Sequence, residues 1–175
     1  MKTKRTFAFM TQAAIIAALY AALTLVLAPI GFGPFQCRVS EALTILAAFT
    51  PAAIPGLSLG CLISNAIGLV MGLNPTGAID MIFGTAATLL AAICSYLLRN
   101  IRWFSVPVLS TLPPVIFNIL IIGAELSYVL HIPYWLAAFV EVGIGEFIAC
   151  CVIGIPLSFA IVKFGLEKFL QKLLS

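Results

Sequence analysis

The chain has 175 residues, of which 63% are hydrophobic and only 9% are charged, whereas roughly a quarter of the residues of a soluble domain carry a charge. A soluble fold of this length cannot hide so much apolar surface, so we expect residues 1–175 to form one all-α domain embedded in a lipid bilayer. The net charge of +3 does not indicate a nucleic-acid partner, because the nine basic residues lie in short clusters between apolar runs.

The apolar runs predict six membrane-spanning helices. A span needs about 20 apolar residues, and the runs divide at proline, glycine and charged residues. The first run resembles a secretory signal, but it exceeds the roughly 7–15 residues of a signal core, so we expect it to be retained. The second is short and bounded by Pro51 and Pro55, whereas Pro156 is expected to kink the sixth rather than end it. The predicted spans are 7–28, 40–53, 56–73, 78–98, 106–125 and 135–162.

Lysine and arginine residues beside the spans predict the orientation, because cytoplasmic segments carry the excess of positive charge. If the N-terminus is cytoplasmic, Arg38 is the only basic residue placed outside. An odd number of spans would separate the two termini and remove this asymmetry, so we expect both in the cytoplasm. Residues 163–175 have an amphipathic helical pattern, which predicts a tail along the inner interface. The basic residues on the cytoplasmic side are Lys2, Lys4, Arg5, Arg99, Arg102, Lys163, Lys168 and Lys172.

Motifs for enzymatic chemistry and metal binding are absent from the sequence. It contains no GxxxxGK[ST] phosphate loop, no suggestion of a Ser/His/Asp or Cys/His set, and five cysteines without CxxC spacing. His131 falls in an expected outer loop, and a lone histidine does not predict a metal site. We therefore expect a protein that is not an enzyme and has neither a cofactor nor a metal.

Five acidic residues lie within or beside the predicted spans, in the half of the bilayer that the orientation places outside. A charge near the centre of a span costs at least about 2.5–3.5 kcal/mol, so such residues usually face a cavity or a partner. They predict an outward-opening pocket, rich in acceptors, for a cation or a ligand with several N–H donors. Alternatively, some of them lie among lipid headgroups or are protonated and hydrogen-bonded within the bundle. The five are Glu41, Asp80, Glu125, Glu141 and Glu146.

The last two acids share the sixth span. Glu141 is expected about 9 Å from its outer end and Glu146 about 16 Å, at the rise of an α-helix. Their separation of five residues corresponds to roughly 140° around an α-helix, so one face of a pocket need not hold both.

Other candidate binding residues are an amide and two aromatic side chains. Asn118 lies about two helical turns before Glu125, hence on nearly the same face, where it either bonds a neighbouring helix or contacts the ligand. Phe83 and Trp135 cluster with Tyr128 and Tyr134 near the outer boundary, where aromatic residues typically form an interfacial belt. Stacking on a flat ligand is the alternative.

Small residues recur every four positions in two spans, which permits close approach of another helix. In span three, packing within the chain explains the stripe. Span one has two parallel stripes, and such a broad flat face either docks a partner protein or packs within the chain. The residues in span three are Gly56, Gly60, Ser64, Gly68 and Gly72, and those in span one are Ala14, Ala18 and Ala22 beside Ala13, Ala17 and Ala21.

The stretch GPFQCRVSEALTILAAFTPAAIPGLSLGCLISN, residues 33–65, resembles the QueT family of queuosine-precursor transporters. Members of that family are substrate-binding S components of energy-coupling factor (ECF) transporters. The stretch NPTGAIDMIFGTAATLLAA, residues 74–92, and the AxxxA pattern of span one add to the resemblance, which covers most of the chain. Of these motifs, residues 33–65 are specific, whereas AxxxA alone is weak.

The resemblance implies a six-helix bundle in the plasma membrane that binds its ligand from outside, near the outer ends of spans four to six and under the first outer loop. It also implies partners, namely a transmembrane scaffold subunit docked on the AxxxA face and two ATPases. The implied ligand is a deazaguanine precursor of queuosine, whose ring N–H and amino group one carboxylate can accept together.

Individual residues match the motifs of the family in two places. Arg38 and Glu41, with Gln36 and Ser40, match the motif after the first loop, and Asp80 with Phe83 matches the motif in span four. The motifs do not say which of these contact the ligand, and Arg38 pairing with Glu41 to fix the loop is a structural alternative.

Two other functions stay open on the sequence. One is an S component for another vitamin or a cationic small molecule. The other is a membrane assembly subunit that transports nothing, although such a subunit has no reason to bear the desolvation cost of buried acids.

Overall fold

The computed structural model is a bundle of helices and describes residues 2–32, 36–74 and 76–174. In these residues the only extended pairing is an isolated bridge between Trp103 and Val106, so the predicted all-α class is confirmed for them. Elements α1–α8 are α-helices, η1–η3 are 3₁₀ helices, and η4 and η5 are π-helices. The order is α1 (Lys2–Val26), α2 (Ala28–Gly31), η1 (Val39–Ala48), α3 (Ala53–Val70), α4 (Ala78–Leu97), η2 (Leu98–Asn100), η3 (Val108–Thr111), α5 (Leu112–Leu130), η4 (Leu136–Gly143), α6 (Ile144–Phe147), η5 (Ile148–Ile153), α7 (Gly154–Lys163) and α8 (Leu166–Leu174).

Five predicted spans are confirmed as helices long and apolar enough to cross a bilayer. The last runs unbroken from Leu136 to Lys163, so Pro156 does not end it, as predicted. The π-helical turns of η5 end at Ile153, within the turn that precedes Pro156, whose nitrogen cannot donate a hydrogen bond to that turn. The five helices are Thr3–Val26, Ala53–Val70, Ala78–Asn100, Val108–Leu130 and Leu136–Lys163.

The second predicted span, residues 40–53, contains a shorter helix than expected. This helix is η1, which has ten residues. The predicted boundary at Pro55 was also wrong, because α3 already begins at Ala53 and a proline is tolerated in the first turn of a helix. A 3₁₀ helix rises about 2.0 Å per residue instead of about 1.5 Å, so η1 is longer than an α-helix of ten residues.

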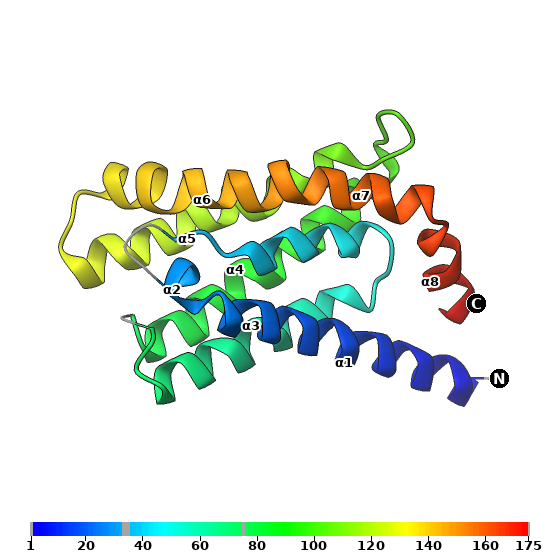
Figure 1. The fold of residues 1–175 in the computed structure, drawn as a ribbon, viewed down its shortest axis with the longest axis horizontal. Helices are drawn as coiled ribbons and strands as arrows, with labels where there is room; N and C mark the ends of the chain where they lie inside the picture. Colours follow the sequence, from blue (N-terminus) through cyan, green and yellow to red (C-terminus); the bar gives the residue numbers. More distant parts are fainter. Residues whose placement is uncertain (1, 33–35, 75, 175) are drawn as a thin grey trace.

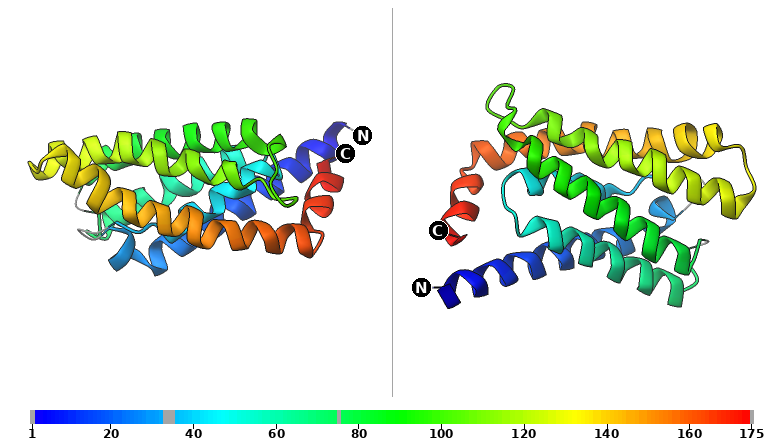
Figure 2. Two further views of the ribbon diagram at one scale, coloured as in Figure 1. Left: turned by 90° about the horizontal axis from the view of Figure 1, so that it is seen from above. Right: turned by 180° about the vertical axis from the view of Figure 1, so that it is seen from behind.

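Both termini lie at the same end of the bundle, together with α8 (Figures 1 and 2). The Gln12 side chain donates to the carbonyl oxygen of Leu170 at 3.1 Å, which joins α1 to α8. Arg102, in the loop before α5, forms an ion pair with Glu167 of α8. The predicted tail is thus a helix that contacts two other segments at this end.

The two alanine stripes of α1 have different environments. Ala13, Ala17 and Ala21 are buried, whereas Ala14, Ala18 and Ala22 are exposed. The buried stripe packs against small residues of α3, since a Cβ added at Gly56 would lie 2.8 Å from the carbonyl oxygen of Ala13. A Cβ at Gly60 would lie 2.8 Å from that of Ala17. The interpretation of the α3 stripe as internal packing is confirmed at these two glycines.

Candidate functional site

Polar side chains gather inside the apolar bundle. They come from α1, from the segment that leads into η1, and from the membrane-spanning helices that follow. Because burial removes these side chains from bulk water, each polar group there needs a partner in the protein or in a ligand. The buried members with ionisable or amide side chains include Tyr20, Gln36, Arg38, Glu41, Asn65, Asn74, Asp80, Asn118, Glu125 and Glu146.

A buried ion pair joins the segment before η1 to α4. Arg38, which precedes η1, and Asp80, in the first turn of α4, are 5% and 1% exposed. The same Asp80 oxygen accepts a hydrogen bond from the Asn74 side chain at 2.8 Å, and Asn65 donates to the Asp80 carbonyl oxygen at 2.9 Å. The other Asp80 oxygen, Oδ1, and Arg38 Nε have no hydrogen-bond partner among the described residues.

Glu41 has a different set of partners, so its suggested pairing with Arg38 was wrong. One carboxylate oxygen accepts hydrogen bonds from Tyr20 and, at 2.9 Å, from Thr88, and the other accepts one from Thr44 at 2.9 Å. These hydroxyl groups come from α1, α4 and η1 itself. Glu41 therefore holds η1 between α1 and α4, and Arg38 is left to bind Asp80.

Helix α6 contributes Glu146, which is 2% exposed. The Cys150 thiol donates to its Oε2 at 3.5 Å, and Asn118 of α5 lies beside it. Arg38 and Glu41 are within electrostatic range of the Glu146 carboxylate. Within the part of the chain that the structure describes, Asn118 Nδ2 has no hydrogen-bond acceptor at bonding distance.

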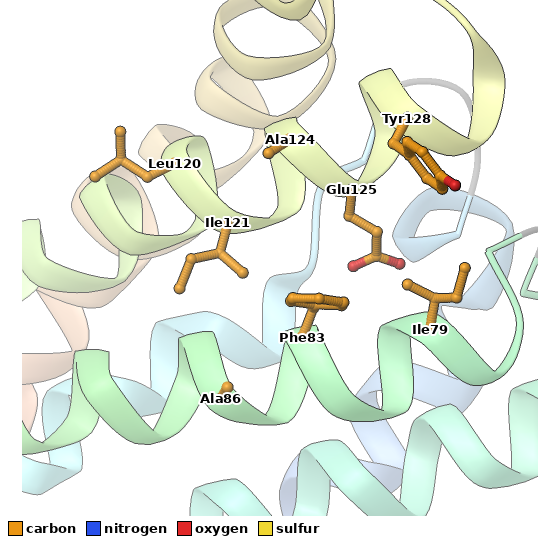
Figure 3. A pocket seen from close by; sticks show the side chains of 8 residues that line it. All are labelled: Ile79, Phe83, Ala86, Leu120, Ile121, Ala124, Glu125 and Tyr128. Atoms are coloured by element: carbon orange, nitrogen blue, oxygen red, sulfur yellow. The ribbon is translucent and has the colours of Figure 1, made fainter.

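Glu125 of α5 lies at the edge of this cluster and is 6% exposed. Its carboxylate points from α5 toward α4 and lies beside Phe83 and Ile79 (Figure 3). Neither oxygen has a hydrogen bond to any residue in 2–32, 36–74 and 76–174. Asp80 and Arg38 are within electrostatic range. A groove of about 670 Å³ opens next to it, lined by Ile79, Phe83, Ala86, Leu120, Ile121, Ala124, Glu125 and Tyr128.

Glu141, in the π-helical turns of η4, is half-buried. Its carbonyl oxygen accepts a hydrogen bond from the Gln36 N–H at 2.9 Å, and its side-chain Oε2 is buried with no partner in the described ranges. A Cβ at Gly145 would lie 1.9 Å from the Gln36 carbonyl oxygen. The segment before Arg38 therefore lies directly against η4 and α6. Since a π turn closes on the fifth residue along, the α-helical angle expected between Glu141 and Glu146 does not apply here.

The structure brings most of the predicted site residues together, but not all of them. Phe83 is 49% exposed and lines the groove, whereas Trp135 is 63% exposed at the start of η4, outside the buried cluster. Sequence reasoning missed Tyr20, Asn65 and Asn74. The signal for the first two was a polar group within an apolar span.

Comparisons with known proteins agree on one family. The sequence model of the QueT transporter family matches residues 10–163. The queuosine precursor transporter QueT of Lactococcus lactis subsp. cremoris (strain MG1363) is 38% identical over 91 residues, which are 51% of this chain and 49% of the relative. The match thus spans about half the length of that curated relative. No solved structure matches the chain.

Proposed function

Because the chain belongs to the QueT transporter family, we propose that it is the substrate-binding subunit of an ATP-driven ECF importer. Its proposed ligand is a deazaguanine precursor of queuosine, taken up across the plasma membrane. The five helices of spanning length make the chain a multi-pass membrane protein. The name of the L. lactis relative, a queuosine precursor transporter, supports the choice of ligand.

The observation that carries the proposal is a set of buried polar atoms without partners among the described residues. Leaving such a group unpaired costs about 1–3 kcal/mol, and more when it is charged. A deazaguanine offers ring and amino N–H groups that carboxylates accept in charge-assisted hydrogen bonds, and its carbonyl can accept from an amide. A ligand of this kind would pair groups that the protein leaves unpaired. They are Asp80 Oδ1, Asn118 Nδ2, both oxygens of Glu125, and Glu141 Oε2.

The exposed stripe of α1 is the proposed docking surface for the transmembrane scaffold subunit, which would connect the chain to two ATPases. Ala14, Ala18 and Ala22 face outward along one side of α1, and their small side chains permit close approach of another helix. The neighbouring stripe of Ala13, Ala17 and Ala21 is already packed against α3. The exposed stripe is therefore the one free to meet a partner.

We also propose that the chain crosses the membrane six times with both termini in the cytoplasm, η1 and its flanking segments making the second crossing. The common position of the termini in the bundle (Figure 1) supports an even number of crossings. Arg102 lies at the same end, bonded to α8, as the positive-inside rule requires.

Cysteine labelling tests this topology. Ser105→Cys and His131→Cys, each in a variant lacking the five free native cysteines, place one exposed thiol in each of two loops. We expect a membrane-impermeant maleimide to label the cysteine at His131 in intact cells, and the one at Ser105 only after the cells are opened. Labelling of both in intact cells would contradict the six-span topology.

Calorimetry on the purified chain, without scaffold or ATPases, tests the function itself. Titration with aminomethyl deazaguanine is expected to show binding at about 1:1 stoichiometry. Glu141→Gln should weaken it by roughly 1.5–3 kcal/mol if Glu141 accepts the paired N–H donors, since that is the typical contribution of a hydrogen bond to a charged group. Thiamine, a cation of different shape, serves as the control ligand. Saturable binding of thiamine, with none of the deazaguanine, would refute the proposed substrate.

A further inference from the structure

The position of Glu125 sets it apart from the other buried acids. Asp80 is bonded to Arg38 and Asn74, Glu41 accepts hydrogen bonds from three hydroxyl groups, and Glu146 accepts one from the Cys150 thiol. Both oxygens of Glu125 lack a hydrogen bond to any described residue, although its side chain is only 6% exposed. The Thr76 side chain is near the carboxylate, but neither Glu125 oxygen accepts a hydrogen bond from it. A carboxylate in this position has lost most of its hydration without gaining hydrogen bonds in return.

The groove beside Glu125 has one charged residue in an otherwise apolar wall. Its other lining residues are aliphatic or aromatic, and none of the groove's residues is basic. Figure 3 shows Phe83 on α4 directly below the Glu125 carboxylate and Tyr128 one turn further along α5. A cavity of about 670 Å³ with this lining suits a flat or apolar body that carries one group complementary to a carboxylate.

Arg38, the described cation that acts on Glu125, is already engaged in an ion pair. Arg38 is within electrostatic range, but its guanidinium is paired with Asp80. A ligand that supplies its own positive charge can therefore bind Glu125 without breaking the Arg38–Asp80 ion pair.

We propose that Glu125 is a specificity-determining residue, the counter-ion for a protonated primary amine on a ligand whose flat body lies in the groove against Phe83. This inference rests on the proposed function and deepens it. Of the deazaguanine precursors, it selects the aminomethyl form, which is a cation, over the neutral cyano form.

The selectivity is expected because the Glu125 carboxylate oxygens have no hydrogen-bond donor within the described residues. An ammonium group donates to the Glu125 oxygens in a charge-assisted hydrogen bond. A nitrile has no N–H, so it would exclude the remaining water and leave the carboxylate unpaired, and sites of this kind reject a ligand that lacks the expected donor.

A comparison of two ligands and three proteins tests the inference. In calorimetry on protein in phosphatidylcholine nanodiscs, the wild-type chain should bind aminomethyl deazaguanine roughly 10- to 150-fold more tightly than cyano deazaguanine. Glu125→Gln, which is nearly isosteric, should remove most of this preference by weakening binding of the amine. The control Glu167→Gln removes an acidic side chain from α8 and should leave the preference unchanged. Thermal unfolding without ligand should show that Glu125→Gln is at least as stable as wild type.

Each alternative has its own result. Equal affinity of the wild-type chain for both deazaguanines, unchanged in Glu125→Gln, would overturn the role of Glu125 and leave the proposed function intact. Binding of neither compound would refute the function together with the inference. If phosphatidylethanolamine in the nanodiscs weakens binding of the amine to wild type but not to Glu125→Gln, the groove takes a lipid amine and the inference is wrong about its ligand.

Discussion

Replacing Ala18 with tryptophan is expected to abolish uptake of the ligand while leaving its affinity for the purified chain within a few fold. Ala18 is exposed and belongs to the stripe of α1 that is not packed against α3. A large side chain there would prevent the close approach of a scaffold helix without entering the buried cluster. Radiolabelled uptake in cells, co-purification of the scaffold and ATPases, and calorimetry on the isolated chain measure the three effects.

Ala17→Trp is the matched control on the buried stripe. Ala17 is only 6% exposed and packs against Gly60, so the added volume overfills the contact between α1 and α3 and should cost about 1–3 kcal/mol of stability or more. Binding and thermal stability should then fall together. If Ala18→Trp also lost binding in detergent, where no scaffold is present, the docking role would be refuted.

Replacing Arg38 with methionine is expected to destabilise the fold by about 3–5 kcal/mol, because the buried Asp80 carboxylate would lose its counter-ion. Both residues of the pair are at most 5% exposed. Unfolding of the purified protein by denaturing detergent measures the change. The double variant Arg38→Met with Asp80→Asn should recover much of the loss, since no uncompensated charge remains.

The ion pair between Arg102 and Glu167 is the matched control for this effect. Its side chains are 33% and 17% exposed, and pairs in contact with solvent typically contribute about 0–1 kcal/mol. Arg102→Met should therefore change the stability far less than Arg38→Met does. Equal losses in the two variants would contradict the structural role assigned to the buried pair.

The spans could be predicted from the sequence because membrane crossing depends on length and hydropathy, which are local properties. Local patterns did not determine η1. An apolar run between Arg38 and Pro51 has the same composition whether it winds as an α-helix or as a 3₁₀ helix, so its form and length depend on packing against α1 and α4. The start of α3 ahead of Pro55 is likewise set by the turn that precedes it.

Pairing inside the site could not be predicted for a related reason. Arg38 and Glu41 are three residues apart, which favoured a local pair, but the fold brings Asp80, 42 positions away, to Arg38. The hydroxyl groups that bind Glu41 come from α1 and α4 as well as from η1. The acids were found because buried charge is rare in spans, whereas their partners depend on how the helices meet.

The two alanine stripes of α1 show what a pattern leaves open. Both repeat every four residues, so spacing alone cannot tell which one faces the bundle. Gly56 and Gly60 of α3 pack closely against Ala13 and Ala17. Because this contact buries their stripe, the stripe of Ala14, Ala18 and Ala22 is left exposed. The sequence predicted the same position near the outer boundary for Trp135 and for Phe83, yet of these two only Phe83 lines the groove.

Mass spectrometry of ligand retained by the chain through mild purification tests the central claim most directly. The chain is expressed in cells supplied with deazaguanines and a mixture of vitamins, and bound small molecules are released by denaturation and identified. We expect a deazaguanine, in its aminomethyl form, at close to one molecule per chain, and its loss from Asn118→Leu, which removes an amide with an unpaired Nδ2. Recovery of a different vitamin at that stoichiometry would contradict the account.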